Sequence, residues 1–309
     1  MTEQKTISGR AWAEMILLAL IWGGSFLAVS FALREVGFLT IVAHRVFWAM
    51  PMLWAIVWLR GYARPRGWRI WGAFLVMGIL NNVLPFSLLV WAQTFVEGGL
   101  VSILNAATAV FGVVIAALVF ADERLTRRKI TGVLIGFAGV VFTIGIGNLL
   151  RFDPRSTAQL AVVLAALCYA LASSWARKTM GHLPTELAAA GMLTGASVVI
   201  VPAALWIEGL PTFNLQPATF AALGFYSFVA TGLAFLLYYR VMKMAGSGNL
   251  MLVTLMVPPT AIMMGALVLG EHLAAREFIG FGLVAIGLMV IDGRLPKLLL
   301  GLLRGAKIR

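Results

Sequence analysis

Charged residues are scarce in this sequence, and their scarcity excludes a soluble protein. Of the 309 residues, 12% are charged and 61% are apolar, and the mean hydropathy is +0.96. A soluble globular chain carries about 25% charged and about 45–50% apolar residues. So few charges do not cover a water-exposed surface of this size, and the same figures exclude intrinsic disorder and a collagen-like fibre. The composition is that of a polytopic membrane protein.

The residue types that catalytic and metal sites need are scarce too. One cysteine, Cys168, cannot form an intramolecular disulfide, and the three histidines form no H-E-x-x-H zinc motif. An intramembrane enzyme remains an alternative, either a lipid transferase or a serine protease that pairs Ser25 with His44. We expect neither an enzyme nor a cofactor. The G-x-x-x-x-G-K-[ST] phosphate loop does not occur, so this chain does not use ATP directly.

What the chain does have is long apolar runs. A helix needs about 20 apolar residues to cross a hydrocarbon core of about 30 Å. The runs are uniformly apolar rather than alternating, which disfavours a β-barrel. The sequence therefore predicts an all-α protein with ten transmembrane helices, at residues 14–33, 38–59, 70–93, 100–120, 130–149, 158–176, 187–207, 220–242, 250–269 and 276–292.

The basic residues predict the orientation of these segments. A net charge of +12 would suit nucleic acid, but the 24 Lys and Arg are spread among short breaks between apolar runs. The positive-inside rule explains that pattern, so we expect no nucleic-acid partner. The outer segments hold only Arg34, Arg151, Arg155 and Arg276, while Arg45 lies within a span and the other nineteen lie on the inner side. The sequence therefore predicts an inner-membrane protein with both termini in the cytoplasm.

A shift of 148 residues lays one half of the chain on the other. The shared phrase is an acidic residue that closes one apolar segment, a short basic turn and a glycine-spaced segment. Glu123, Leu125, Arg128, Gly132, Gly139 and Gly145 fall on Glu271, Leu273, Arg276, Gly280, Gly287 and Gly293. Because each half has five segments, the second repeat (151–309) must enter the membrane inverted relative to the first (1–150). Inverted repeats are typical of secondary transporters with a midplane site, although they also build channels.

Three short stretches of the sequence resemble a known family. They are the run IWGGSF at 21–26, the pair His44-Arg45 with Ala49, and the run from Leu269-Gly270-Glu271 through Gly280 to Gly287. In these residues the chain resembles the EamA family of the drug/metabolite transporter superfamily, and the resemblance covers residues 12–293. Within the family it is most similar to bacterial amino-acid exporters of the YddG type. The resemblance implies ten helices, export of small metabolites such as aromatic or neutral amino acids, and a cavity lined mainly by the first, third, fourth, sixth, eighth and ninth helices.

Prolines mark the expected hinges. The family's proline is present in the second repeat as Pro258, followed by Pro259, whereas Val110 stands at that place in the first. The resemblance therefore implies a sharper kink in segment 250–269 than in segment 100–120, because proline removes a backbone donor. We expect Pro258, Pro259 and Pro85 to act as hinges or gates.

Polar side chains within the apolar segments are candidate substrate ligands, because such groups usually face a cavity or the bundle interior. Asn81 and Asn82 point about 100° apart, so only one of them is expected to face a central cavity. Asn105 belongs to a small, polar stripe that begins at Ser102, and its amide suits both ends of a zwitterion. Interhelical hydrogen bonds and close helix packing are the alternative explanations.

Aromatic rings and one basic residue complete the candidate site. Trp22, Tyr169 and Tyr226 lie near the middle of their segments and are candidate walls for an amino-acid side chain, with buried ring packing as the alternative. Arg45 is placed to attract a substrate carboxylate, unless it snorkels to the outer interface or pairs with a polar neighbour. No Asp or Glu lies at the middle of a segment, which favours facilitated transport, or coupling through His44, over a carboxylate proton relay.

The sequence therefore predicts a monomeric transporter in membrane lipid that exports small molecules, aromatic or neutral amino acids above all, by alternating access around a central cavity. An exporter of drugs or other metabolites with the same fold is the alternative. A passive channel is a further one, although the chain has no repeated filter motif. The G-x-x-x-G patterns at 132–136 and 191–195 are expected to pack helices within the chain rather than between copies.

Overall fold

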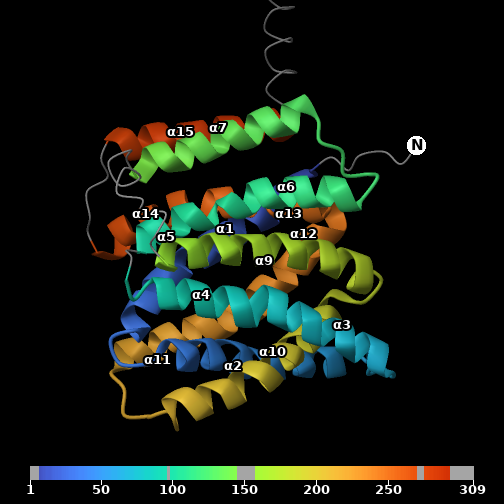
Figure 1. Cartoon of the computed structure of the whole chain (residues 1–309), viewed down its shortest axis with the longest axis vertical. Coiled ribbons are helices and arrows are strands. Elements are labelled where there is room, and N and C mark those ends of the chain that lie inside the picture. Colours follow the sequence, from blue (N-terminus) through green and yellow to red (C-terminus); the bar gives the residue numbers. More distant parts are fainter. Residues whose placement is uncertain (1–6, 96–97, 145–156, 270–274, 293–309) are drawn as a thin grey trace, which may run out of the picture.

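The protein folds as a bundle of helices. The computed structural model describes residues 7–95, 98–144, 157–269 and 275–292, and every regular element in these ranges is helical, which confirms the all-α class. The first half contains α1 (Gly9–Ala32), α2 (Phe38–Leu59), α3 (Trp68–Gly78), the π-helix η1 (Ile79–Val83), α4 (Leu84–Ala92), α5 (Gly98–Asn105), α6 (Ala107–Val119) and α7 (Arg127–Ile144). The second half contains α9 (Thr157–Met180), α10 (Thr185–Glu208), α11 (Pro217–Gly224), the π-helix η2 (Phe225–Leu233), α12 (Ala234–Ala245), α13 (Ser247–Leu250), α14 (Val253–Leu269) and α15 (Ala275–Asp292). The axes of most of these helices lie roughly side by side across the bundle (Figure 1).

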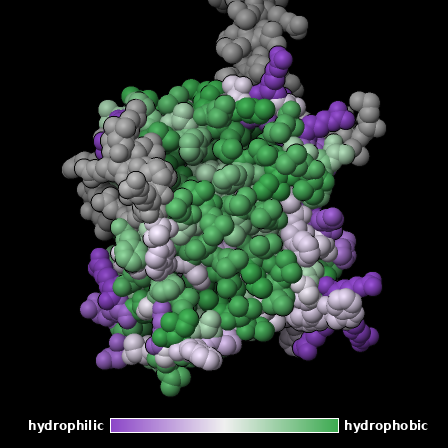
Figure 2. Space-filling view, in the orientation of Figure 1, coloured by the Kyte–Doolittle hydropathy of each residue, from purple (hydrophilic) through white to green (hydrophobic). Residues whose placement is uncertain are grey.

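Eight helical runs in the described part of the chain are long and apolar enough to cross a membrane, when α3 to α4 and α11 to α12 each count as one run. They match eight of the ten predicted segments. The other two segments contain α7 and α15, each 18 residues long with three charged residues, so composition alone does not mark these two helices as spans. Figure 2 shows a broad apolar face with hydrophilic residues along its left and right margins, where the helices of Figure 1 end. This is the surface of a multi-pass membrane protein.

Each half contains one apolar helix that turns π-helical part-way along. After each π-helix the next amide donates to a carbonyl five residues back, from Leu84 N to Ile79 O and from Ala234 N to Val229 O. Pro85 lies two residues after η1, in the first turn of α4, where a missing N–H is tolerated. The 148-residue shift that aligns the two halves places the whole of η1 within η2.

The fourth predicted segment of each half is interrupted. Ala106 separates α5 from α6, and Met251 and Leu252 separate α13 from α14. Helix α14 continues through Pro258 and Pro259, so the sharper kink expected in the ninth segment stays a prediction. Neither break therefore lies at a proline.

Helix contacts between the halves occur in matching pairs. Helix α1 packs against α14 as α9 packs against α6, and α9 packs against α4 as α1 packs against α12. Two further pairs join helices at equivalent places in the halves, α2 with α10 and α7 with α15. Figure 1 shows α7 and α15 together along the upper edge of the bundle, away from α2 and α10.

Glycines bring the backbones of α7 and α15 together. A Cβ at Gly139 would lie 2.9 Å from Gly280 O and 2.8 Å from Val284 N, and a Cβ at Gly287 would lie 2.7 Å from Gly132 O. Gly191 and Gly195 likewise allow α3 to pack closely against α10, since a Cβ there would collide with Phe74 and the backbone beside it. The predicted use of the G-x-x-x-G patterns for packing within the chain is confirmed.

Ion pairs gather at the end of the bundle where α6 ends and α7 begins. The buried carboxylate of Glu123 accepts from Lys129 Nζ at 3.3 Å, from Arg177 Nη1 at 3.0 Å and from Gly248 N at 3.4 Å. Arg177, near the end of α9, also pairs with Asp122. This group, here called the Glu123 cluster, ties α6, α7, α9 and α13 together.

The glycine contact between α7 and α15 generates a stability prediction. Gly139→Ala should lower the free energy of unfolding by about 1–3 kcal/mol, because the added methyl meets backbone atoms that do not move aside. Gly282→Ala in α15 is the matched control, because a Cβ there meets no described atom within 4 Å. The measurement is the thermal melting of both purified variants in detergent, and equal melting temperatures would show that the close contact does not stabilise the pair.

Candidate functional site

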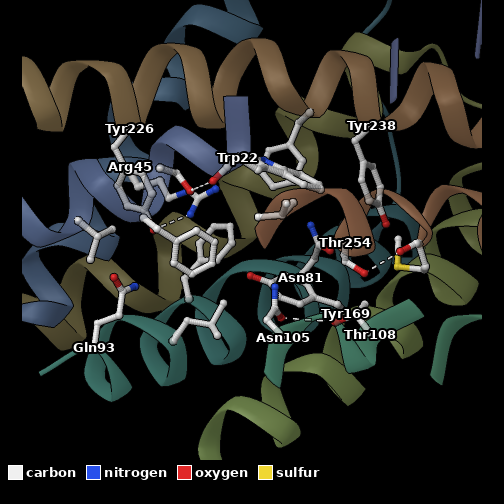
Figure 3. A pocket seen from close by; sticks show the side chains of 18 residues that line it. Trp22, Arg45, Asn81, Gln93, Asn105, Thr108, Tyr169, Tyr226, Tyr238 and Thr254 are labelled. Carbon is white, nitrogen blue, oxygen red and sulfur yellow. Dashed lines mark hydrogen bonds between the residues drawn. The ribbon is translucent and has the colours of Figure 1, made fainter. Parts of the chain in front are cut away.

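A cavity lies inside the bundle between the two halves. The space there that protein atoms leave free is about 680 Å³, including the part open to solvent. The first half contributes side chains from α1, α2, η1, α4, α5 and α6, and the second from α9, η2, α12, α14 and the turn before it. The lining residues are Trp22, Ser25, Phe26, Val29, Arg45, Asn81, Phe86, Leu89, Gln93, Asn105, Thr108, Tyr169, Tyr226, Phe235, Tyr238, Met251, Thr254 and Val257 (Figure 3).

Six of the seven predicted substrate ligands line this cavity. They are Trp22, Arg45, Asn81, Asn105, Tyr169 and Tyr226. Asn82 does not line it; its side chain is fully buried, and neither atom of its amide has a hydrogen-bond partner among the described residues. The prolines named as hinges, Pro85, Pro258 and Pro259, lie in helices that border the cavity but do not line it.

The π-helix η1 decides which asparagine faces the cavity. In a regular α-helix, Asn82 would share a face with Phe86, Leu89 and Gln93, since these positions follow at intervals of three and four. A π-helical turn contains an extra residue, so the residue on the same face as Phe86 is the one five positions earlier rather than four. Asn81 therefore occupies the position on that face that Asn82 would have in an α-helix. Asn81 Nδ2 lies 3.5 Å from Met192 Sδ.

Arg45 is buried in the cavity wall. Its guanidinium donates from Nε to Thr231 Oγ1 at 2.7 Å, from Nη1 to the Tyr226 hydroxyl at 2.6 Å and from Nη2 to Ala230 O at 3.1 Å. The guanidinium carbon lies 3.5 Å from the centroid of the Phe86 ring and 4.2 Å from that of Tyr226. Arg45 is 5% exposed and forms no ion pair with a described residue, so it does not snorkel to the surface.

The π-helix η2 supplies the acceptors that hold Arg45. Because Ala234 N donates to Val229 and Thr231, the carbonyl of Ala230 loses the partner it would have in an α-helix. That carbonyl accepts instead from Arg45 Nη2 and, at 3.2 Å, from Trp22 Nε1. One backbone oxygen of η2 thus positions a cavity residue on α1 and another on α2.

Aromatic rings form the apolar walls. The Trp22 and Tyr238 ring centroids are 6.3 Å apart, and those of Phe86 and Tyr169 are 6.2 Å apart. In Figure 3 Arg45, Tyr226 and Gln93 lie toward one end of the cavity and Tyr238, Thr254 and Thr108 toward the other. The charged side chain of Arg45 therefore lies at one end and neutral hydroxyl groups lie at the other.

Several lining residues were not predicted from the sequence. The amide of Asn105 accepts from Thr108 at 3.4 Å, which places two polar groups of the α5–α6 break side by side. Gln93 Oε1 is buried and has no hydrogen-bond partner among the described residues, so it is an acceptor available to a ligand. Phe86 and Gln93 follow Asn82 at intervals typical of one helical face, a spacing signal that was present in the sequence.

Ser25 and His44 are not brought together. Ser25 lines the cavity and donates to Trp22 O at 2.6 Å, whereas His44 lines a second, apolar pocket between α2 and α10 and accepts from Trp48 Nε1 at 3.1 Å. The hypothetical serine–histidine pair therefore does not form. Among the described residues no cluster of three metal-ligating side chains occurs.

Comparison with known proteins accords with this arrangement. A profile of the EamA-like transporter family matches residues 10–145 and 156–292, so the match occurs twice. A probable amino-acid metabolite efflux pump of Escherichia coli is 24% identical and spans 89% of this chain and 92% of its own length. A probable terminal-alkyne amino-acid exporter of Streptantibioticus cattleyicolor is 25% identical and spans 93% and 95%. An uncharacterized transporter of Archaeoglobus fulgidus is 26% identical and spans 79% and 84%.

A solved structure shares the fold. A crystal structure superposes with a TM-score of 0.76 at 18% identity and covers 91% of this chain and 97% of that chain. The relatives above are transporters and efflux pumps rather than enzymes, as the sequence analysis expected for this chain.

The contact between α2 and η2 generates a prediction about the cavity wall. Thr231→Val keeps the shape of the side chain but removes the acceptor of Arg45 Nε, leaving a buried donor unpaired. We expect a loss of about 1–3 kcal/mol in the free energy of unfolding, and little loss for Thr231→Ser, which keeps the hydroxyl. Thermal melting of the two variants measures the difference. If both variants melted alike, the hydroxyl would have no part in holding Arg45.

Proposed function

The chain belongs to the EamA-like transporter family, and from this premise we propose that it exports amino-acid metabolites, aromatic and neutral ones above all, across the inner membrane. The observation that carries the proposal is the cavity between the halves around Arg45, lined by polar and aromatic side chains from both. A site at the interface of two repeats is the arrangement on which alternating access depends. The printed names of two relatives, an amino-acid metabolite efflux pump and an amino-acid exporter, support the substrate class.

We propose ten membrane-spanning helices in two inverted repeats, residues 1–150 and 151–309. Three observations support this arrangement: the family profile matches twice, a π-helix lies at the same place in each half, and the contacts between halves occur in matching pairs. Five spans in each half invert the second repeat and leave both termini in the cytoplasm. The boundary between the repeats, at residue 150, and Glu271, the counterpart of Glu123, lie outside the described residues, which omit 145–156 and 270–274.

The cavity is proposed to alternate between the two sides of the membrane. Its lining includes Gln93 at the outer end of the α4 run, whereas at the inner end the Glu123 cluster ties four helices together. We therefore propose that this conformation is an outward-facing state whose inner end is closed. The breaks at Ala106 and at Met251–Leu252, with the nearby Pro258 and Pro259, are proposed hinges for opening that end. The proposed carrier acts as a monomer in membrane lipid.

The proposal is tested by counterflow. Purified protein is placed in liposomes loaded with an unlabelled amino acid, and the entry of labelled phenylalanine, threonine or methionine is followed. A carrier gives saturable entry that rises when unlabelled substrate is inside. Entry that neither saturates nor responds to internal substrate would indicate a channel, and no entry of any of the three would contradict the substrate class.

Substitution of one cavity amide should weaken counterflow without unfolding the protein. Asn105 accepts from Thr108 at the long distance of 3.4 Å, so Asn105→Ala removes a substrate-facing amide at little structural cost. We expect a drop of about threefold in the initial rate at low substrate, the size of one lost hydrogen bond of ordinary net strength. Asn214→Ala, in the exposed stretch between α10 and α11, is the control. An undiminished rate in the Asn105 variant would remove this residue from the site.

Weakening the Glu123 cluster should open the inner end. In Glu123→Gln the ion pairs to Lys129 and Arg177 are lost, so a cysteine placed at Thr108 should react several-fold faster with a membrane-impermeant thiol reagent added at the cytoplasmic face. The native Cys168 is replaced by serine in all variants. Glu186→Gln, at the start of α10, is the matched control. Equal labelling rates in the two variants would show that the cluster does not hold the inner end closed.

A further inference from the structure

The charge of the cavity wall is one-sided. Among the described lining residues Arg45 is the one charged side chain, and no Asp or Glu lines the cavity. A ligand therefore meets a fixed positive charge at one end, aromatic rings in the middle and neutral amides and hydroxyls elsewhere. On the basis of the proposed function, we propose that the cavity recognises its substrate by the carboxylate. The cavity selects carboxylate anions with an apolar body, and the substrate's α-amino group is dispensable.

Arg45 has donors left for such a ligand. A guanidinium carries five N–H groups, and its three hydrogen bonds to Thr231, Tyr226 and Ala230 use three of them. Two N–H groups remain, one on each terminal nitrogen, and no described residue accepts from them. Two donors on neighbouring nitrogens match the two oxygens of a carboxylate.

The rings around Arg45 restrict how a ligand can approach. The guanidinium carbon lies 3.5 Å from the Phe86 centroid and 4.2 Å from the Tyr226 centroid, so aromatic rings occupy positions over the planar group. A ligand then reaches the guanidinium at its edge, where the free N–H groups lie. An edge approach places the carboxylate at the guanidinium and leaves the apolar body to extend along the Trp22 and Tyr169 rings, as the arrangement in Figure 3 allows.

The charges of the cavity wall favour an anion over a cation. A buried guanidinium without a counter-ion carries a desolvation cost that a bound carboxylate offsets. An ammonium group finds no carboxylate on the cavity wall, and the unpartnered Gln93 Oε1 is a neutral acceptor. A neutral acceptor replaces one hydrogen bond to water and adds little net free energy. Loss of the carboxylate should therefore weaken binding strongly, and loss of the amino group only slightly.

Four ligands of nearly the same shape test the inference. They are phenylalanine, 3-phenylpropionate, which lacks the amino group, 2-phenylethylamine, which lacks the carboxylate, and 3-phenylpropionamide, in which the carboxylate is a neutral amide. Binding to the purified protein is measured by ligand-induced thermal stabilisation and, in liposomes, by competition with labelled phenylalanine. We expect 3-phenylpropionate to bind within about threefold of phenylalanine, and the amine and the amide at least about tenfold more weakly, as the loss of one charge-assisted hydrogen-bonded pair requires.

Substitutions of Arg45 separate recognition from folding. Arg45→Lys keeps the charge but loses the paired N–H donors of the planar guanidinium, and Arg45→Gln loses both. Arg34→Gln is the matched control, because it removes an arginine beside the Phe31 ring at the outer surface. The readout is the ratio of affinities for 3-phenylpropionate and 3-phenylpropionamide, which a change in the amount of folded protein does not alter. We expect the ratio to fall about tenfold or more in Arg45→Gln, less in Arg45→Lys and not at all in Arg34→Gln. Because Arg45→Gln removes three hydrogen bonds, Arg45→Lys or the four-ligand series on the wild-type protein decides the matter if that variant does not fold.

The outcomes distinguish this inference from the proposed function. If phenylalanine shows counterflow but 3-phenylpropionate neither binds nor competes, the inference is overturned and the carrier stands. If 2-phenylethylamine binds as well as phenylalanine, the inference is also overturned. If the carboxylates bind with the expected order but no labelled substrate shows counterflow, carboxylate recognition stands and the proposed transport activity fails.

Discussion

The carbonyl oxygen of Ala230 is the atom on which the cavity depends. It accepts from Trp22 on α1 and from Arg45 on α2, and it is available because η2 replaces regular α-helix at this depth. Within a membrane every backbone carbonyl needs a partner, so a helix leaves one free only where side chains can replace the lost bond. The irregular helix and the two donor side chains therefore require each other, and together they fix where the cavity wall lies.

The two halves repeat the scaffold but not the chemistry. Each half has a π-helix in its third predicted segment and a break in its fourth, and these irregular places surround the cavity. The 148-residue shift, however, places Leu193 opposite Arg45 and Gly78 opposite Tyr226. The two halves share a scaffold, while the one charged side chain among the described lining residues comes from the first half. A substrate would therefore bind with a defined orientation.

Much of this architecture could be predicted from the sequence, because uniform apolar runs with charged breaks determine where membrane helices begin and end. The polar and aromatic residues that a membrane helix retains for use were also recognisable, which is why Trp22, Arg45 and Asn105 were found. The choice between Asn81 and Asn82 was not predictable, because it depends on a π-turn that shifts the register by one residue. The break at Ala106 was not predictable either, because no proline lies near it in the sequence. Gln93 was missed because it lies at the end of its run, where a polar residue is ordinary.

The location of a bound substrate tests the account most directly. A structure of the protein with 4-bromophenylalanine would reveal the ligand by the anomalous scattering of bromine. We predict one peak in the cavity among the rings of Trp22, Phe86 and Tyr169, with the carboxylate at the edge of the Arg45 guanidinium. A peak in the second pocket beside His44, or a ligand in the cavity whose carboxylate points away from Arg45, would contradict it.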